Sequence, residues 1–270
     1  MKKMLLVVFA AWLWCLSALA TDNLRLPDVR SLGMGGNGGA HSALFNPSLL
    51  GLQTAKSLRA DYYSRYSMKE LATLSGGFCY PNRTLPVGLH VASFGYDEYR
   101  ESLFRLSAGK RLNASWALGI GVQYAVLQSE IFESDITRIS TDIGIAFQPV
   151  DNLLTGLSII NSPSVSLNDE GIDSKRIGAY LAALDANWYM MNDVLITAGI
   201  AHCEETPLSA SLGMEYLATD DFHLRAGVRT SPFQPSLGIG YRFNGVMIDA
   251  VMIYHPVLGA SLGLGLSYSF

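Results

Sequence analysis

The last twelve residues of the chain alternate between apolar and small polar side chains. Every second position from Ala260 to Phe270 is apolar, and serine or glycine fills the positions between them. This period of two predicts a β-strand with one oily face and one small, polar face. Similar runs recur upstream, and the chain ends on an aromatic residue. Together these features are typical of a transmembrane β-barrel.

Runs of this kind, separated by turn residues, predict fourteen strands. The strands span 56–66, 69–80, 84–96, 99–111, 114–128, 137–149, 152–161, 175–190, 193–203, 207–217, 221–230, 235–243, 245–255 and 259–270. Their lengths suit a strand of about ten residues that crosses a bilayer. Because the number is even, both ends of the wall are expected on the periplasmic side.

The links between the predicted strands are of two kinds. Links after even-numbered strands are short and contain turn residues: Pro81-Asn82, Asn113, Asp151-Asn152, Asn192-Asp193, Thr219-Asp220 and Asn244-Gly245. Two links after odd-numbered strands are longer, 129–136 and 161–174. Short periplasmic turns and longer outer loops are the asymmetry of outer-membrane barrels.

The outward-facing positions near the strand ends are often aromatic, and aromatic side chains are favoured at the level of the lipid headgroups. The predicted periplasmic belt is Phe78, Tyr80, Trp116, Phe147, Trp188, Tyr216, Phe222, Phe243, Tyr268 and Phe270. A sparser outer belt comprises Tyr62, Tyr66, Tyr124 and Tyr254.

The positions expected to face the lumen contain many of the charged residues of the strands. The predicted lumen charges are Arg59, Asp61, Arg65, Glu101, Arg105, Asp142, Asp185, Glu215, Arg225, Arg229, Arg242 and Asp249. Such charges either guide a solute or pair with one another inside a filled lumen, where unpaired charges are costly.

The amino terminus predicts export. Lys2 and Lys3 precede an apolar run from Met4 to Trp14, and Ala18 to Ala20 form a small-residue cleavage site, as in a secretory signal peptide. The predicted organisation is a cleaved signal peptide at 1–20, an amino-terminal hatch at 21–55 and a barrel at 56–270. Cleavage leaves 17 basic and 23 acidic residues, a formal charge of −6, which argues against nucleic acid as a partner.

Residues 21–55 do not alternate, and they hold a dense glycine cluster between Ser31 and Ala40. The cluster formally matches the GxGxxG nucleotide fingerprint but lacks the strand and helix that the fingerprint requires. Glycines here are expected to let backbone pack against backbone in the lumen. Asn46-Pro47 forms either an ordinary turn or part of a gate. The candidate gating residues are Gly33, Gly35, Gly36, Gly38, Asn46 and Pro47.

The segment Ser31–Gly36, followed by Phe45–Ser48 and Leu49–Gly51, resembles the hatch of the FadL family of outer-membrane channels. It is also similar to the PorV and PorQ barrels of type IX secretion. The resemblance implies a fourteen-strand barrel with a small plug in the lumen. This chain departs from the family in having Ser48 where the hatch usually has alanine, and in having short outer loops. Phe270 resembles the signal read by the outer-membrane assembly machinery.

No catalytic, metal-binding or cofactor-binding motif is found. Cys79 and Cys203 fall near opposite rims, which predicts two thiols rather than a disulfide. His41 belongs to the hatch, and His90, His223 and His255 face the lumen from different strands. His202 points toward lipid, ahead of Glu204 and Glu205, where a solvated loop is the plainer interpretation than catalysis. We therefore expect no enzyme activity and no cofactor.

Two hypotheses remain for function. The first is a passive channel for small hydrophobic molecules, which pass a shifting hatch and leave through the lumen or through a lateral gap in the wall. Glycine-rich stretches such as Gly76-Gly77 are candidates for weakening strand pairing enough to make such a gap. The second is a structural or interaction barrel that serves a type IX secretion or envelope-assembly partner. Either protein is expected to be a monomer in contact with outer-membrane lipid of a Gram-negative bacterium.

Overall fold

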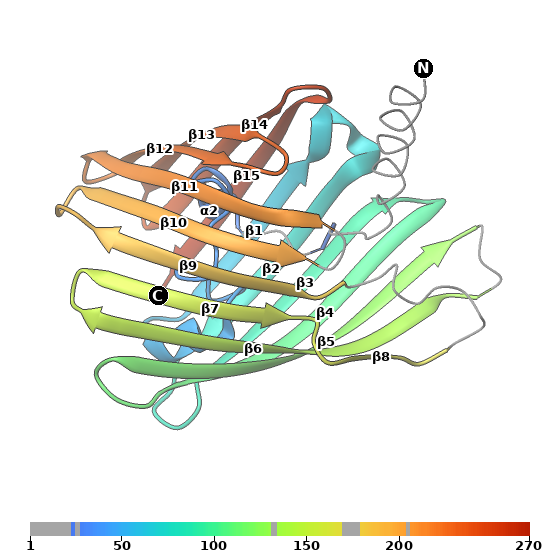
Figure 1. Cartoon of the computed structure of the whole chain (residues 1–270), viewed down its shortest axis with the longest axis horizontal. Helices are drawn as coiled ribbons and strands as arrows, with labels where there is room; N and C mark the ends of the chain where they lie inside the picture. Colours follow the sequence, from blue (N-terminus) through green and yellow to red (C-terminus); the bar gives the residue numbers. More distant parts are fainter. Residues whose placement is uncertain (1–22, 25–27, 131–133, 169–178, 204–205) are drawn as a thin grey trace, which may run out of the picture.

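The wall is a closed antiparallel β-barrel of fourteen strands (Figure 1), so the predicted all-β class is confirmed. The computed structural model describes residues 23–24, 28–130, 134–168, 179–203 and 206–270. The wall strands are β1 (Ser57–Ser64), β2 (Ala72–Tyr80), β3 (Val87–Tyr96), β4 (Tyr99–Arg111), β5 (Trp116–Ser129), β6 (Ile136–Val150), β7 (Leu153–Ile160), β9 (Leu181–Tyr189), β10 (Val194–Cys203), β11 (Thr206–Thr219), β12 (Phe222–Arg229), β13 (Gln234–Phe243), β14 (Val246–His255) and β15 (Gly259–Ser269).

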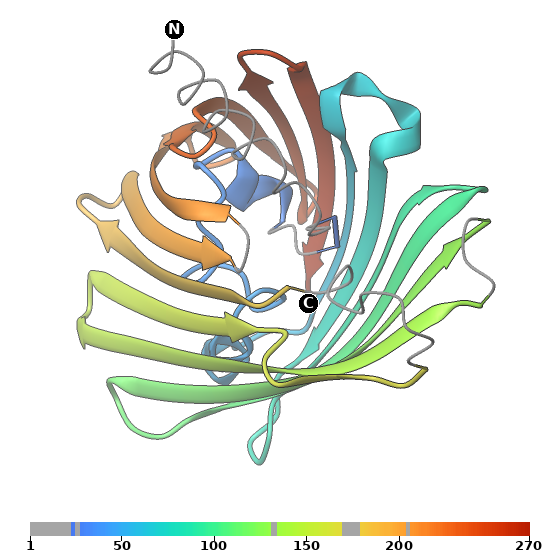
Figure 2. The same ribbon diagram turned by 45° about the vertical axis from the view of Figure 1, so that its right-hand side comes forward.

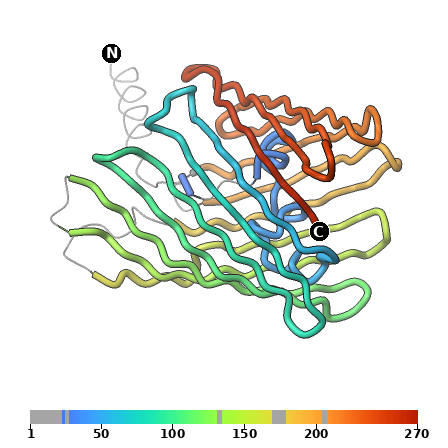
Figure 3. The backbone as a smooth tube through the Cα atoms, turned by 180° about the vertical axis from the view of Figure 1, so that it is seen from behind, coloured from blue at the N-terminus to red at the C-terminus, as the bar shows by residue number. Residues whose placement is uncertain are grey.

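The barrel closes where the last strand meets the first. β15 pairs with β1 from Ser57 opposite Ser269 to Ser64 opposite Leu262, and the two strands lie side by side in Figure 3. Lys56 and Phe270 extend the pairing through two backbone hydrogen bonds of 3.0 and 2.9 Å. We call this end of the barrel the terminal rim. The opposite end is the loop rim.

The alternation predicted from the sequence is present in the wall. On β15, Leu262, Leu264 and Leu266 are exposed on the outer face, whereas Ser261 and Gly263 are buried toward the lumen. Because successive side chains of a strand point to opposite faces, a lipid-facing wall shows this pattern on every strand.

The predicted aromatic belt surrounds the terminal rim on the outer face. Trp116 stacks on Phe147 with ring centroids 4.3 Å apart. Tyr268 stacks on Phe270 at 5.6 Å, and the ammonium of Lys56 lies 5.8 Å from the Phe270 ring. Rings at this level suit the boundary between headgroups and hydrocarbon.

The predicted strands 56–66 and 69–80 are too long at the loop rim. Arg65–Ser67 and Lys69–Leu71 form the short 3-10 turns η2 and η3 instead. Tyr66 and Ser67 have φ values of 54° and 58°, and this left-handed backbone ends the strand. Tyr66 therefore leaves the predicted outer belt. Its ring packs on His255 at 5.8 Å, and its N–H donates to Ser261 Oγ at 2.9 Å.

The expected link 161–174 contains a further strand. After β7, the chain continues along β6 as β8 (Ser164–Ser166), while the pairing of β7 with β9 ends at Ile160 opposite Leu181. Asn161, with φ of 60°, marks this bend and donates its N–H to Asp142 Oδ1 at 2.9 Å. The start of the predicted strand 175–190 lies outside the described residues, as does the signal peptide at 1–20.

The strand pairing around Gly76-Gly77 is continuous, so the structure has no lateral gap at this stretch. Gly76 pairs with Ala60 on β1 and with Val91 on β3. Ladder hydrogen bonds are made by backbone groups, which glycine retains. Gly77 faces the lumen, where the side chain of Leu44 lies against it.

Candidate functional site: a filled lumen

The described residues between 23 and 55, here called the plug, lie inside the barrel, as Figure 2 shows. The plug contains a helical turn, α2 (Val29–Leu32), and a 3-10 helix, η1 (Pro47–Leu52). α2 packs against β1 and β13–β15, whereas η1 packs against β3–β6. The plug therefore crosses the lumen from one wall to the opposite wall.

Asn46 and Pro47 begin η1 at the wall. The Asn46 side chain is fully buried and accepts hydrogen bonds from the N–H of Ser48 at 3.1 Å and from Ser48 Oγ at 2.7 Å. Its Nδ2 donates to Gly39 O at 2.6 Å. Pro47 occupies the first turn, where no N–H is needed. This pair ties the two halves of the plug together.

Replacement of Asn46 by alanine should therefore destabilise the protein. It removes the cap of η1 and leaves buried N–H and carbonyl groups without partners, a loss of about 2 kcal/mol in the free energy of unfolding. Urea unfolding in detergent micelles, followed by tryptophan fluorescence, measures the loss. Asn82→Ala, at an exposed turn on the terminal rim, is the matched control. An equal loss in both variants would contradict a role for Asn46 in holding the plug.

The wall carries glycines where the plug backbone touches it. A Cβ atom at any of them would collide with backbone atoms of the plug. We call this set the glycine seat: Gly109, Gly119, Gly144, Gly156, Gly213 and Gly227. The sequence interpretation did not single them out, although their inward parity is a signal that could have found them.

The predicted gating glycines lie along this contact. Gly35 and Gly36 have φ values of 79° and 82°, which other residues adopt only with strain. The N–H of Gly35 donates to Ser236 Oγ at 3.3 Å, and Ser236 Oγ donates to Gly33 O at 3.2 Å. Gly38 O accepts from the N–H of Ser42 at 2.8 Å. The cluster thus lets the plug turn tightly against β11–β13.

A chain of alternating charges joins the plug to one side of the wall. Arg30 of the plug contacts Glu215 at 2.5 Å, and Glu215 contacts Arg225 at 2.6 Å. Arg225 contacts Asp249 at 2.7 Å, and Asp249 lies 3.4 Å from Arg59. Glu215, Arg225 and Asp249 are buried.

The same charge chain returns to the plug through Arg59. Its guanidinium lies 2.8 Å from Asp61 and 3.5 Å from Asp28, the residue that caps α2. Although burial opposes ionisation, the Arg59 charge lowers the pKa of Asp28 well below its usual range. Asp28 and Arg30, two charges of opposite sign near the start of α2, thus hold the plug to the wall.

A second polar cluster holds the other half of the plug. Arg105 contacts Asp142 at 2.8 Å and donates to Leu44 O of the plug at 2.5 Å. Gln123 donates to Asp142 Oδ1 at 2.7 Å. Asp185 accepts from the N–H of Gly39 at 2.6 Å. These wall groups all form hydrogen bonds or ion pairs with backbone atoms of the plug or with other charged groups inside the lumen.

The remaining predicted lumen charges lie nearer the rims. Glu101 accepts from Asn23 Nδ2 at 2.6 Å, and Arg65 donates to Asn23 Oδ1 at 2.6 Å. Arg229 donates from Nε to Gly35 O at 3.3 Å. Arg242 is exposed at the terminal rim. The sequence interpretation missed Asp28, Arg30 and Asn23, because plug residues follow no period that predicts their direction.

Two cavities flank the plug. The loop-side cavity has a volume of about 150 Å³, and its lining includes Leu32, Gly35, Tyr66 and Arg229. The terminal-side cavity has a volume of about 640 Å³ and is lined by Arg30 of the plug and by wall residues such as Glu215 and Arg242. Residues 30–36 therefore lie between the two cavities.

The histidines and cysteines show no constellation for chemistry within the described residues. Cys79 and Cys203 are buried and not joined by a disulfide, as predicted. Burial, with a contribution from the Arg30 charge, lowers the pKa of His41 to about 3, so His41 is neutral at physiological pH. In this part of the chain, no group of three or more His, Cys, Asp or Glu residues is placed to hold a metal ion. No helix among these residues is long and apolar enough to cross a membrane.

The fold and lumen define a class of protein, the plugged fourteen-strand barrel. No family model and no curated protein match the sequence. Among solved structures, the P. putida toluene transporter TodX superposes with a TM-score of 0.65 and 11% identity, over 92% of this chain and 99% of TodX. The CymD monoaromatic hydrocarbon channel gives 0.64 and 13%, over 93% and 99%.

A Pseudomonas aeruginosa FadL homologue is similar at a TM-score of 0.63 and 14% identity, over 90% of this chain and 98% of the homologue. At such identities the likeness shows a common fold. It confirms the fourteen-strand barrel expected from the sequence. None of these structures bears on the resemblance to the PorV and PorQ barrels.

Proposed function

We propose that the protein is a passive outer-membrane channel for small hydrophobic molecules and that the plug is its gate. The observation that carries this proposal is the position of residues 30–36 between the two cavities, since Leu32 lines one and Arg30 the other. A displacement of this short stretch would join the cavities into a path along the lumen. The similarly folded TodX is a toluene transporter and CymD is a monoaromatic hydrocarbon channel, which supports the solute class.

The proposal includes a location and an orientation. The aromatic belt and oily outer face suit the outer membrane of a Gram-negative bacterium, with the terminal rim toward the periplasm. We further propose a monomer without enzyme activity, exported by residues 1–20 and inserted by the assembly machinery through Phe270.

Deletion of residues 31–48 tests the gate. We expect cells that produce the deleted protein to take up a small hydrophobic fluorescent dye several times faster than cells that produce equal amounts of the wild type. The deletion removes the second half of α2, the glycine cluster and the start of η1, so the lumen loses its partition. The retained heat-modifiable migration of a folded barrel on gels serves as the control. Unchanged uptake by a folded barrel would count against the channel.

The charge chain also supports a second proposal, a non-transporting barrel for a type IX secretion or envelope-assembly partner. Its ion pairs hold the plug closed through buried groups on β11, β12 and β14. Chemical crosslinking in native outer membranes, followed by mass spectrometry, tests it. A specific partner absent from an unrelated barrel of the same size would support it, and its absence would remove this alternative.

A further inference from the structure

The lining of the terminal-side cavity combines apolar and polar groups. Strands β9–β11 contribute most of its apolar side chains, which are Tyr189, Val194, Leu195 and Leu217. Hydroxyl groups come from Ser267 and Ser269 of β15, which lies beyond β12–β14 in the wall. The volume of about 640 Å³ is in the range of small-molecule sites. Such a cavity suits a ligand that is itself partly apolar and partly polar.

The buried charges of this cavity are paired with one another. Glu215 contacts Arg30 at 2.5 Å, and Asp249 lies 3.4 Å from Arg59. The lining also contains one further charge of each sign, Arg242 and Asp193. Because the buried carboxylates already neutralise the arginines beside them, a ligand in this cavity need not carry a charge.

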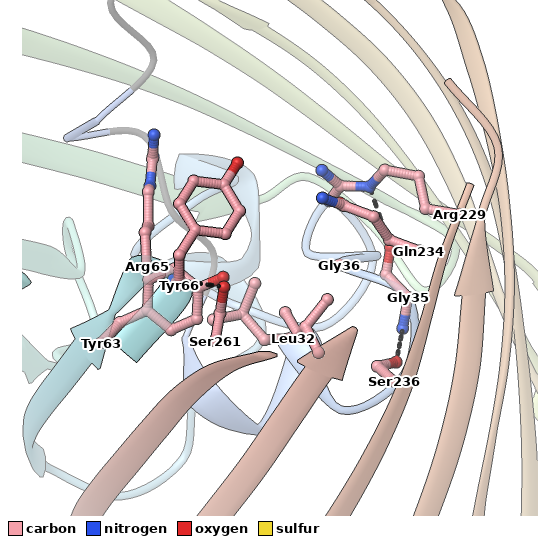
Figure 4. Close-up of a pocket in the computed structure, with 11 residues that line it drawn as sticks. Leu32, Gly35, Gly36, Tyr63, Arg65, Tyr66, Arg229, Gln234, Ser236 and Ser261 are labelled. Atoms are coloured by element: carbon pink, nitrogen blue, oxygen red, sulfur yellow. Dashed lines mark hydrogen bonds between the residues drawn. The ribbon is translucent and has the colours of Figure 1, made fainter. Parts of the chain in front are cut away.

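One polar side chain of this lining, His223 of β12, lacks a hydrogen-bond partner. The residue is only 6% exposed, and neither ring nitrogen forms a hydrogen bond with any residue that the structure describes. Figure 4 shows the contrast on the loop side of the plug, where the N–H of Gly35 donates to Ser236 and the N–H of Tyr66 donates to Ser261. A buried polar group without a partner is costly, so a ligand that supplies the partner gains affinity.

A neighbouring carboxylate decides what kind of partner the His223 ring needs. Nδ1 of His223 lies 3.8 Å from Oε2 of Glu215, which is too far for a hydrogen bond. The negative charge nevertheless favours the tautomer of the neutral ring that carries its proton on Nδ1. In that tautomer Nε2 holds a lone pair and can only accept a hydrogen bond. The partner that is missing is therefore a donor, such as the hydroxyl group of a ligand.

We propose that the terminal-side cavity binds a small hydroxylated aromatic molecule of the phenol class, with its ring against Leu195 and Leu217 and its hydroxyl group donating to Nε2 of His223. Leu217 and His223 are direct register partners on β11 and β12, so an apolar contact and the acceptor lie side by side. A hydrocarbon in the same place would leave Nε2 without a donor, which is unfavourable. This inference rests on the proposed channel and assigns it a substrate class, the phenols.

The direct test compares phenol with anisole, its methyl ether, which has the same ring and oxygen atom but no hydroxyl hydrogen to donate. Isothermal titration calorimetry of the purified protein in detergent micelles measures both affinities, with titrations into micelles alone subtracted. The pH is slightly alkaline, where an ordinary histidine is neutral. We expect phenol to bind about tenfold more tightly than anisole, as one hydrogen bond to an otherwise unpartnered buried group predicts.

The variant His223→Phe keeps a flat ring in the lining but removes the acceptor. It should weaken phenol binding about tenfold and leave anisole binding unchanged, so that the preference for phenol disappears. His90→Phe is the matched control, because His90 is also buried in the lumen but lines a different, smaller cavity. This variant should keep the preference. Heat-modifiable migration shows whether each barrel is folded, and the comparison of phenol with anisole on the wild type needs no variant.

Three results would overturn the inference: no binding of phenol to the wild type beyond that to micelles, equal binding of phenol and anisole, or a preference that survives His223→Phe. Uptake of labelled toluene and labelled phenol by cells with the 31–48 deletion separates this failure from failure of the channel itself. Faster toluene uptake without a preference for phenol rejects the phenol site and keeps the channel. Unchanged uptake of both compounds rejects the channel, and with it phenols as its solutes.

Discussion

Replacement of Gly227 by valine should unseat the plug and open the lumen. Gly227 lies on β12, and a Cβ atom there would collide with the backbone of Met34 and Gly35. Met34 is fully buried, and backbone cannot rotate away as a flexible side chain can. We expect dye uptake to rise toward that of the 31–48 deletion. Forcing the extra atoms into a filled interior costs about 1–3 kcal/mol, which the plug avoids by leaving its seat.

Gly76→Val provides the matched control. Gly76 also lies in a wall strand, but the nearest atoms to its added Cβ are at 3.7 Å, an ordinary contact. This variant should keep wild-type uptake. Limited trypsin digestion of the purified proteins gives a second readout, because cleavage at Arg30 should become faster when the plug leaves its seat. If Gly227→Val shows the uptake and digestion pattern of the wild type, the glycine seat does not hold the gate.

The wall could be predicted from the sequence because the bilayer constrains it. Because lipid surrounds the barrel and its interior is polar, apolar and polar residues must alternate on every strand. The outward direction of Leu262 and Leu264 therefore follows from their spacing alone. The same parity places Glu215 and Arg225, on neighbouring strands, in the lumen. It gives no distances, but Glu215 and Arg225 occupy facing register positions on these strands, where opposite charges pair.

The turns at the loop rim could not be predicted in this way. Tyr66 continues the apolar parity of β1, yet its left-handed backbone turns the ring from the lipid side to the cavity. Asn161 similarly continues the alternating pattern of β7, yet its side chain turns inward to Ser140 and Gln123. Such reversals depend on one or two backbone angles, which side-chain periodicity does not encode.

The plug was predicted as a segment but not as a set of contacts. Its glycines indicated close packing, and Gly35 and Gly36 do lie against the wall. Gly35 lies against Gly227, and Gly36 lies against Arg229; these wall residues are far away in the sequence, and only the register of the folded barrel brings them to the plug. The same holds for Arg30, because no residue near it in the sequence indicates that its partner is Glu215, which is 185 residues away.

Replacement of Glu215 by glutamine should produce the largest loss of stability among the lumen charges. Glu215 is buried and contacts Arg30 of the plug and Arg225 of the wall. Removing one partner of a buried ion pair leaves the other charges uncompensated, at a cost of about 3–5 kcal/mol. The measurement is the midpoint and slope of urea unfolding in detergent micelles, with trypsin cleavage near Arg30 as a report on the plug.

Two comparisons make the Glu215→Gln result specific. Asp97→Asn removes a carboxylate that is fully exposed at the loop rim beside Arg100, and such surface pairs contribute about 0–1 kcal/mol. The double variant Arg30→Gln/Glu215→Gln removes the stranded plug charge as well, so it should be less destabilised than the sum of the two single variants. Strict additivity would mean that Arg30 and Glu215 act independently. The plug would then be held without the ion pair between Arg30 and Glu215, and its release would not require that pair to break.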